Sequence, residues 1–294
     1  MPIDSKECAA ALRRQFRKDH GRAAKPAEIE ALREAMVDEH SLSTGGTREV
    51  FRRVAEHEGK FYLDLANDAR EVVEIDREGW QIVTDPPVTF YRHDNVHPLP
   101  TPTRGGTLDE LRGHLPPTLT DRDYLLIVGA VLSWLNPTIG YPILAFRSSQ
   151  ASGKSVTARM LQKLIDPQVT DECGLPQKDE DLALAANSSW TLFFGNLGTI
   201  SERISNVLCR ISTGGAFRCR KLYGQNEECF YRFRRPIILN GIGNFMTRGD
   251  LLGRTYLIDL EPLTGRKTEA ELWKTTTPPT RECSGVSSTR RLPG

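Results

Sequence analysis

The pattern of hydrophobic and polar residues changes along the chain. Residues from about 5 to 40 predict two short helices interrupted near Gly21 and Pro26, because strong helix formers with mixed charges flank those breaks. Short β-type runs separated by turn residues follow as far as residue 92, which predicts a small antiparallel meander. Its strands are expected at Phe61–Leu63, Val72–Ile75, Trp80–Val83 and Val88–Tyr91.

Helical and apolar strand patterns alternate in the second part of the chain. A helix is expected at 121–135 and another at 155–165, where it ends before Asp166-Pro167. Wholly apolar strands are expected at 142–146, 190–194, 236–240 and 256–260. Strands that are apolar on both faces are typical of a parallel sheet covered by helices, so the predicted fold class is α/β.

The best domain boundary is a stretch rich in proline and glycine at 97–106, which we predict to be a linker. It separates an N-terminal region of helices and antiparallel β-structure, 1–96, from a second domain, 107–273. Residues 274–294 are rich in Thr, Ser, Pro and Arg, and this composition is typical of a disordered tail.

Composition excludes few functions. The 294 residues carry a formal net charge of +1, which gives no whole-protein argument for a nucleic-acid or membrane partner. The six cysteines are scattered without a CxxC pair, which favours reduced thiols over a zinc site or a disulfide framework. The longest apolar run, 124–135, is too short to span a bilayer, and no secretory signal is present. We therefore expect a soluble, cytoplasmic protein.

A segment between a predicted strand and a predicted helix fits a phosphate-binding loop of the Walker A type, with Ser148 in place of its first glycine. Small residues let backbone N–H groups wrap a phosphate, Lys154 can reach the β- and γ-phosphates of ATP, and the Ser155 hydroxyl can bind Mg²⁺. A surface lysine among small residues is the alternative. The predicted loop consists of Ser148, Ser149, Gln150, Ala151, Ser152, Gly153, Lys154 and Ser155.

Three later segments, together with the loop, resemble the AAA+ helicase domain of phage and mobile-element primase-helicases, close to superfamily-3 helicases. The first is the strand 190–194 followed by Gly195-Asn196-Leu197, where relatives typically have Asp-Asn-Leu. The second, 208–223, is similar to the motif that forms a DNA-contacting hairpin in superfamily 3. The third, 235–241, is similar to the strand that ends in a sensor asparagine. The resemblance covers about 45–273 and implies a P-loop fold that uses ATP and Mg²⁺.

The resemblance also implies roles for individual residues. Asn196 and Asn240 become candidate catalytic residues, since an asparagine at the end of a strand beside the phosphate loop can orient a water molecule. Arg254, after 251–253, is similar to an arginine finger that reaches the nucleotide of a neighbouring subunit in a ring. The alternatives are a turn asparagine before Gly241 and a solvated arginine at the end of a helix.

The segment 203–235 holds eight basic residues against two acidic ones, a local charge of +6. Aromatic residues alternate with these charges, and two β-type runs flank the turn 224–226, which predicts a hairpin. Basic and aromatic groups can bind single-stranded DNA by phosphate attraction and base stacking, although a solvated basic face remains the alternative. The candidate DNA-contacting residues are Arg218, Arg220, Lys221 and Tyr223.

The chain departs from the family pattern at Gly195, where relatives have the aspartate that holds Mg²⁺. No acid near it in the sequence is an obvious substitute; Glu202 is seven residues on, in the next predicted helix. We therefore hypothesise that the protein binds ATP but hydrolyses it poorly. The tail also departs from the family after Trp273. Its codons, displaced by two bases, can encode an apolar helix, which suggests a frameshift.

Two functions are compatible with these features. The first is an ATP-dependent DNA helicase of a phage or mobile element, assembled as a ring. The second is a non-catalytic nucleotide- or DNA-binding protein, or a degenerate remnant of such a helicase. A small-molecule kinase lacks support, because no acceptor-binding motif is visible. The sequence holds no upstream primase module, so it gives no argument for primer synthesis.

Overall fold

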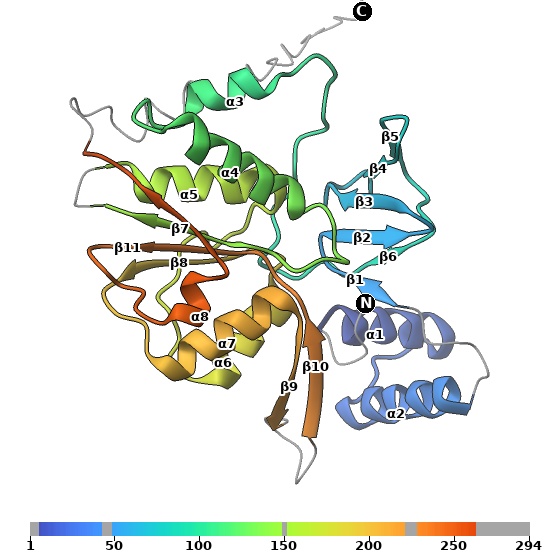
Figure 1. The fold of residues 1–294 in the computed structure, drawn as a ribbon. Coiled ribbons are helices and arrows are strands. Elements are labelled where there is room, and N and C mark those ends of the chain that lie inside the picture. Colours follow the sequence, from blue (N-terminus) through green and yellow to red (C-terminus); the bar gives the residue numbers. More distant parts are fainter. Residues whose placement is uncertain (1–5, 43–48, 149–151, 221–227, 263–294) are drawn as a thin grey trace, which may run out of the picture.

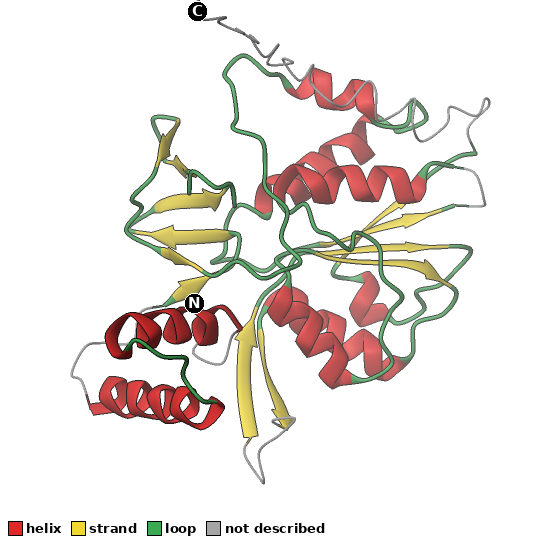
Figure 2. Ribbon diagram, turned by 180° about the vertical axis from the view of Figure 1, so that it is seen from behind, coloured by secondary structure: helices red, strands yellow, loops and turns green. Residues whose placement is uncertain are grey.

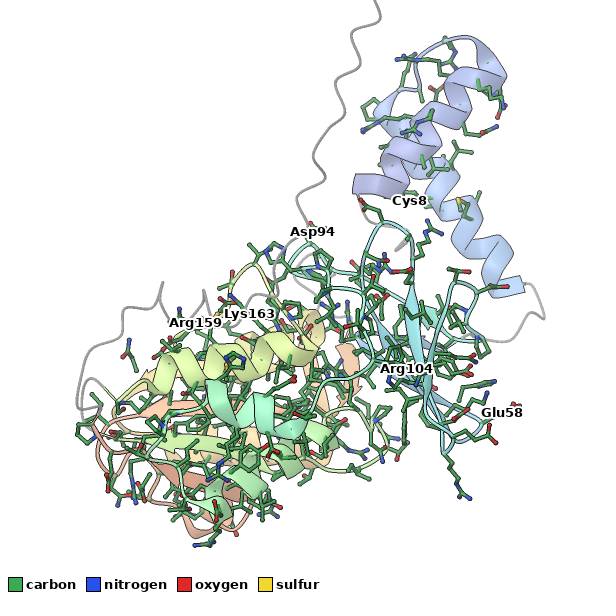
Figure 3. The ribbon with its side chains drawn as sticks, turned by 90° about the horizontal axis from the view of Figure 1, so that it is seen from above. Cys8, Glu58, Asp94, Arg104, Arg159 and Lys163 are labelled. Atoms are coloured by element: carbon green, nitrogen blue, oxygen red, sulfur yellow. The ribbon has the colours of Figure 1, made fainter. Side chains whose placement is uncertain are left out.

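The computed structural model describes residues 6–42, 49–148, 152–220 and 228–262. Its N-terminal part is a pair of helices, α1 (Lys6–His20) and α2 (Pro26–Leu42), which stand apart from the rest of the chain (Figures 1 and 3). Gly21 ends α1 with a positive φ of 67°, and Pro26 begins α2, where its missing N–H needs no partner. The predicted interruption of the helical segment is therefore confirmed.

A four-stranded antiparallel sheet follows in the order β2-β3-β4-β5. Its strands are β2 (Val54–His57), β3 (Lys60–Asp64), β4 (Val72–Ile75) and β5 (Trp80–Val83). The meander is confirmed, and a strand forms where the last one was predicted, but its predicted place in the meander is wrong. Residues from Val88 onward form β6 (Thr89–Phe90), which pairs in parallel with β1 (Val50–Phe51) instead. Pro86 and Pro87 precede β6 and have no N–H to donate to β5, so they interrupt the ladder.

The second sheet is parallel and has the strand order β12-β7-β11-β8. Its strands are β7 (Ile143–Arg147), β8 (Leu192–Leu197), β11 (Ile237–Gly241) and β12 (Thr255–Asp259). Almost every residue of β7, β8 and β11 is buried, as expected for strands that are covered on both faces. The predicted parallel sheet and its four strands are confirmed.

Helices cover both faces of this sheet (Figures 1 and 2). On one face lie α4 (Asp121–Ser133) and α5 (Lys154–Ile165), with α3 (Leu108–His114) beside α4. On the other lie α6 (Asp179–Ser188), α7 (Glu202–Thr213) and α8 (Gly249–Leu252). Alternate residues of the strands point into two separate cores, one under each helical layer. The chain thus forms an α/β fold with three layers.

A β-hairpin extends from the edge of the α6–α7 layer (Figure 1). It consists of β9 (Gly215–Arg220) and β10 (Glu228–Phe233), paired antiparallel from Gly215–Phe233 to Arg220–Glu228. The rings of Phe217 and Phe233 stack at 5.0 Å and fix the base of the hairpin to the core. The predicted hairpin is confirmed, while its turn, 221–227, lies outside the described residues.

A buried ion pair joins the antiparallel sheet to the helical layer of the parallel one. The guanidinium of Arg53 donates from Nε to Asp166 Oδ1 at 3.0 Å, and both side chains are almost fully buried. Arg53 also donates to the carbonyl oxygens of Asp64 and His97. The other carboxylate oxygen of Asp166 accepts from the backbone N–H groups of Trp190 and Thr191. Through these hydrogen bonds Asp166, which follows α5, connects the residues at the start of β8 to Arg53, which directly precedes β2.

None of the helices in the described part of the chain combines the length and apolar character needed to cross a membrane. The cysteines Cys173 and Cys209 are free thiols. The predicted linker 97–106 includes Leu99, which is buried, and Arg104, whose guanidinium stacks on Trp80 at 4.7 Å. The division into domains remains a prediction, and the predicted disordered tail, 274–294, lies outside the described residues.

Candidate nucleotide site

The candidate site lies at the carboxyl ends of β7, β8 and β11, which meet at one edge of the parallel sheet. Open α/β sheets bind their ligands at this edge. The predicted phosphate loop connects β7 to α5, as the sequence pattern requires. Gly153 precedes α5 with a φ of 78°, a left-handed conformation that favours glycine. Ser149, Gln150 and Ala151 lie outside the described residues.

Lys154, the first residue of α5, folds back over the loop. Its ammonium donates to the carbonyl oxygen of Ser148 at 3.3 Å and to Ser152 Oγ at 3.5 Å. Partial burial lowers the pKa of Lys154 from its ordinary value, because desolvation disfavours the charged form. A desolvated ammonium at the N-terminus of a helix is well placed to attract an anion.

Ser155 and Asn240 are brought together, although they are far apart in the sequence. Asn240 lies on β11 beside Phe146 of β7, and its side chain is buried. Its Nδ2 donates to Ser155 Oγ at 2.7 Å. Two of the predicted site residues therefore form one hydrogen-bonded unit directly behind the phosphate loop.

Glu172 fills the space next to Gly195, although it was not among the residues predicted for the site. A Cβ added to Gly195 would lie 1.7 Å from Oε1 of Glu172 and 2.4 Å from its Cδ. The same Oε1 lies 3.5 Å from Ser155 Oγ. No acid near Gly195 was an obvious substitute from the sequence, but the structure places the Glu172 carboxylate beside it. Glu202, the acid considered from the sequence, is instead paired with Arg248 at 2.9 Å.

Backbone pairing holds Glu172 in this place. The next residue, Cys173, forms a one-residue parallel bridge with Phe194 of β8. Its N–H donates to the carbonyl of Phe193 at 3.1 Å, and its carbonyl accepts from the N–H of Gly195 at 3.0 Å. The only sequence signal was a pair of acids, Asp171-Glu172, between the phosphate-loop helix and β8. A single bridging residue has no strand pattern, so the pairing could not be predicted.

Asn196 and Arg254 are not brought into this cluster. Asn196 is exposed and adopts a left-handed conformation, with φ 55°, at a bulge where β8 shifts register against β11. Arg254 precedes β12, and its carbonyl accepts from the N–H of Ile143 at the amino end of β7. It therefore lies at the opposite end of β7 from the phosphate loop, about 13 Å away at ~3.3 Å per residue. Its side chain donates to the carbonyl of Asp250 at 2.9 Å.

Four arginines of the basic segment, Arg203, Arg210, Arg234 and Arg235, have partners within the fold. Arg203 pairs with Asp179, and Arg210 donates to the carbonyl of Ala216 while stacking on Phe217. Arg234 donates to the carbonyls of Thr213 and Pro137. Burial, and then repulsion from Arg52, lowers the pKa of Arg235 to about 10. Half of the eight basic residues thus have structural partners, which the charge count alone did not reveal.

Of the candidate DNA-contacting residues, Arg218 and Arg220 lie on β9, beyond the aromatic base of the hairpin. Lys221 and Tyr223 lie outside the described residues. Within the described ranges, His, Cys, Asp and Glu side chains do not gather in groups of three or more that could hold a metal ion by themselves.

A family model matches this chain over residues 117–283, which is more than half of its 294 residues. The model describes the replication protein of actinomycete integrative conjugative elements. The match includes the whole candidate site, from the phosphate loop to Asn240, as well as the hairpin. Among curated protein sequences, no significant match was found.

Similar solved structures include a JCV helicase bound to a thiazolopyridine acetamide, with 13% identity and a TM-score of 0.37. The match covers 53% of this chain and 44% of that one. The apo C-terminal region of NrS-1 has 11% identity and a TM-score of 0.43, over 70% of this chain and 62% of that one. This chain therefore spans less than two thirds of the length of either structure.

Proposed function

Because this chain belongs to the family of replication proteins of actinomycete integrative conjugative elements, we propose that it is an ATP-binding motor domain that acts on DNA during replication of such an element. In this proposal its parallel sheet is a P-loop fold of the AAA+ type. The replication role follows from the family, and the use of ATP is inferred from the site.

The observation that carries the proposal is the convergence of Lys154, Ser155 and Asn240 behind one strand–loop–helix turn. A lysine that lies across the loop can bind the terminal phosphates of ATP, and the N–H groups at the start of α5 can bind phosphate oxygens. Asn240 donates to the Ser155 hydroxyl and so restrains its orientation at the start of α5. The residues present therefore fit a triphosphate accompanied by Mg²⁺.

When bound, Mg²⁺ would neutralise charge on the phosphate oxygens, and Ser155 would hold it together with water molecules. Within this chain Arg254 lies at the far end of β7, so it can act on a nucleotide only across a subunit contact. The proposal therefore includes a homo-oligomeric ring in which Arg254 reaches the site of a neighbour. Weak hydrolysis no longer follows from Gly195 alone, because the Glu172 carboxylate lies beside it.

We expect Lys154→Ala to weaken ATP binding by roughly 10- to 150-fold, since a charge-assisted hydrogen bond contributes about 1.5–3 kcal/mol. The measurement is the affinity of a fluorescent ATP analogue for the full chain, with and without single-stranded DNA. Lys163→Ala is the matched control, because Lys163 lies further along α5 and pairs with Asp171 at 2.9 Å. A wild-type chain that binds no nucleotide would disprove the proposed function.

We also expect the triple variant Arg218→Gln, Arg220→Gln, Lys221→Gln to bind single-stranded DNA more weakly and with a smaller salt dependence. Each lost phosphate contact lowers the slope of log affinity against log salt by about 0.7. Fluorescence anisotropy of a labelled oligonucleotide at several salt concentrations measures this slope. Arg203→Gln serves as the control, because Arg203 pairs with Asp179. An unchanged slope in the triple variant would exclude the hairpin as the DNA contact.

A further inference from the structure

We propose that Glu172 supplies the carboxylate of the Mg²⁺ site in this chain, in place of the missing side chain at Gly195. The inference rests on the proposed nucleotide-binding function and assigns one more residue to its site. In this site, the missing side chain at Gly195 on β8 leaves room for a carboxylate. The carboxylate comes from Glu172, in the segment before Cys173.

Gly195 and Glu172 compete for the same space. A side chain at this position would begin where the Glu172 carboxylate now lies, because Oε1, Cδ and Cγ are all within 2.7 Å of the added Cβ. Heavy atoms that are not bonded to each other do not approach so closely, so residue 195 can have a side chain only if Glu172 turns away. Glycine and glutamate therefore form a matched pair, in which the absence of one side chain admits the other.

The two carboxylate oxygens of Glu172 face different partners. Oε1 faces the Ser155 hydroxyl at 3.5 Å, and that hydroxyl in turn accepts from Asn240 at 2.7 Å. Oε2 faces Arg159, which lies one turn after Ser155 on α5, at 3.7 Å. Figure 3 shows Arg159 close to Lys163 along α5. One oxygen is therefore turned towards the Ser155 hydroxyl at the start of α5.

The oxygen set suits magnesium. Mg²⁺ in nucleotide sites keeps several water molecules and takes one or two protein oxygens together with phosphate oxygens. A hydroxyl and a carboxylate are sufficient for this, so a cluster of three acidic or imidazole side chains is not needed. The competing explanation is that Glu172 is present only to pair with Arg159. At 3.7 Å and with both side chains about a quarter exposed, that pair contributes little, typically below about 1 kcal/mol.

The test is the metal dependence of nucleotide affinity. A fluorescent ATP analogue is titrated into the full chain, once with EDTA and once with Mg²⁺, and the ratio of the two affinities is the metal enhancement. We expect Glu172→Gln to reduce this enhancement by about tenfold or more while leaving the metal-free affinity within about twofold. Electron paramagnetic resonance of Mn²⁺ added with nucleotide gives a second reading, in which the bound Mn²⁺ signal should weaken.

Two further variants separate a metal role from a structural one. Asp171→Asn removes the neighbouring carboxylate, which pairs with Lys163, and should keep the full enhancement. The double variant Glu172→Ala, Gly195→Asp places a carboxylate on β8 and removes the side chain that occupies its space. It should restore the enhancement that Glu172→Ala alone loses, which a purely structural role for Glu172 would not allow.

The outcomes also separate this inference from the proposed function. If the wild-type chain shows a metal enhancement and Glu172→Gln retains it, Glu172 is not the metal carboxylate, although nucleotide binding stands. If the wild-type chain binds no nucleotide with either EDTA or Mg²⁺, the proposed function fails and this inference fails with it. Thermal unfolding of each variant establishes that a lost enhancement does not come from a lost fold.

Discussion

Replacing Arg53 with methionine is expected to lower the free energy of unfolding by about 3–5 kcal/mol, because it leaves the Asp166 carboxylate buried without its positive partner. The two side chains are 2% and 1% exposed, so water cannot compensate for the loss. The carbonyl oxygens of Asp64 and His97 lose a donor as well. Methionine keeps much of the volume of arginine, so the loss reports on charge and hydrogen bonds.

Chemical denaturation followed by far-ultraviolet circular dichroism measures the effect. The matched control is Arg112→Met, because Arg112 pairs with Asp121 on the surface, where both side chains are well exposed. A surface pair of this kind contributes about 0–1 kcal/mol, so the control should unfold nearly as the wild type does. If Arg53→Met and Arg112→Met had similar effects, the buried pair would not be a main contact between the two sheets.

Replacing Trp134 with alanine is expected to cost about 3–5 kcal/mol, the usual range for a large aromatic residue truncated in a core. Trp134 follows α4 and is completely buried in the core on the α4–α5 face, which also contains Phe146 of β7. Its removal leaves a cavity under the strand that leads into the phosphate loop. The carbonyl of Trp134 accepts from the indole N–H of Trp190, a bond that alanine retains.

Trp134→Phe distinguishes volume from polarity at the same position. The indole N–H of Trp134 is buried without a hydrogen-bond partner among the described residues. Phenylalanine removes this unsatisfied donor and keeps most of the ring, so we expect a much smaller loss than with alanine. Thermal unfolding of the two variants beside the wild type measures both effects. Equal losses would show that the site does not tolerate any change in shape.

The elements with strong local patterns could be predicted from the sequence. The strands Ile143–Arg147 and Ile237–Gly241 were recognisable because burial on both faces leaves them almost wholly apolar, with Arg147 and Asn240 as polar exceptions near their carboxyl ends. The strand–loop–helix context located Lys154 and Ser155, and the structure places Asn240 in contact with Ser155. Local sequence patterns were therefore sufficient to predict the elements and residues whose positions depend on their neighbours in the chain.

Contacts between distant segments could not be predicted. The pairing of β6 with β1 depends on the path that the chain takes after Pro86 and Pro87. No local sequence pattern predicts this path. Glu172 reaches Gly195 through a single bridging residue, which leaves no periodicity in the sequence. Arg235 and Arg234 resemble DNA-binding residues in a charge count, yet their carbonyl partners come from α6 and from the segment after α4. Such side-chain partners are set by tertiary contacts between distant segments, so the local sequence does not predict them.

The Arg53–Asp166 pair limits the ways in which the molecule can move. Rotating the antiparallel sheet against the parallel one would separate two opposite charges that are almost fully buried, at a cost of several kcal/mol. The two sheets should therefore move as one rigid body when a ligand binds at the carboxyl edge. A conformational response to nucleotide would then be confined to parts outside this body, such as the hairpin and the phosphate loop. The antiparallel sheet would then keep its position relative to the parallel sheet in the free and the ligand-bound protein.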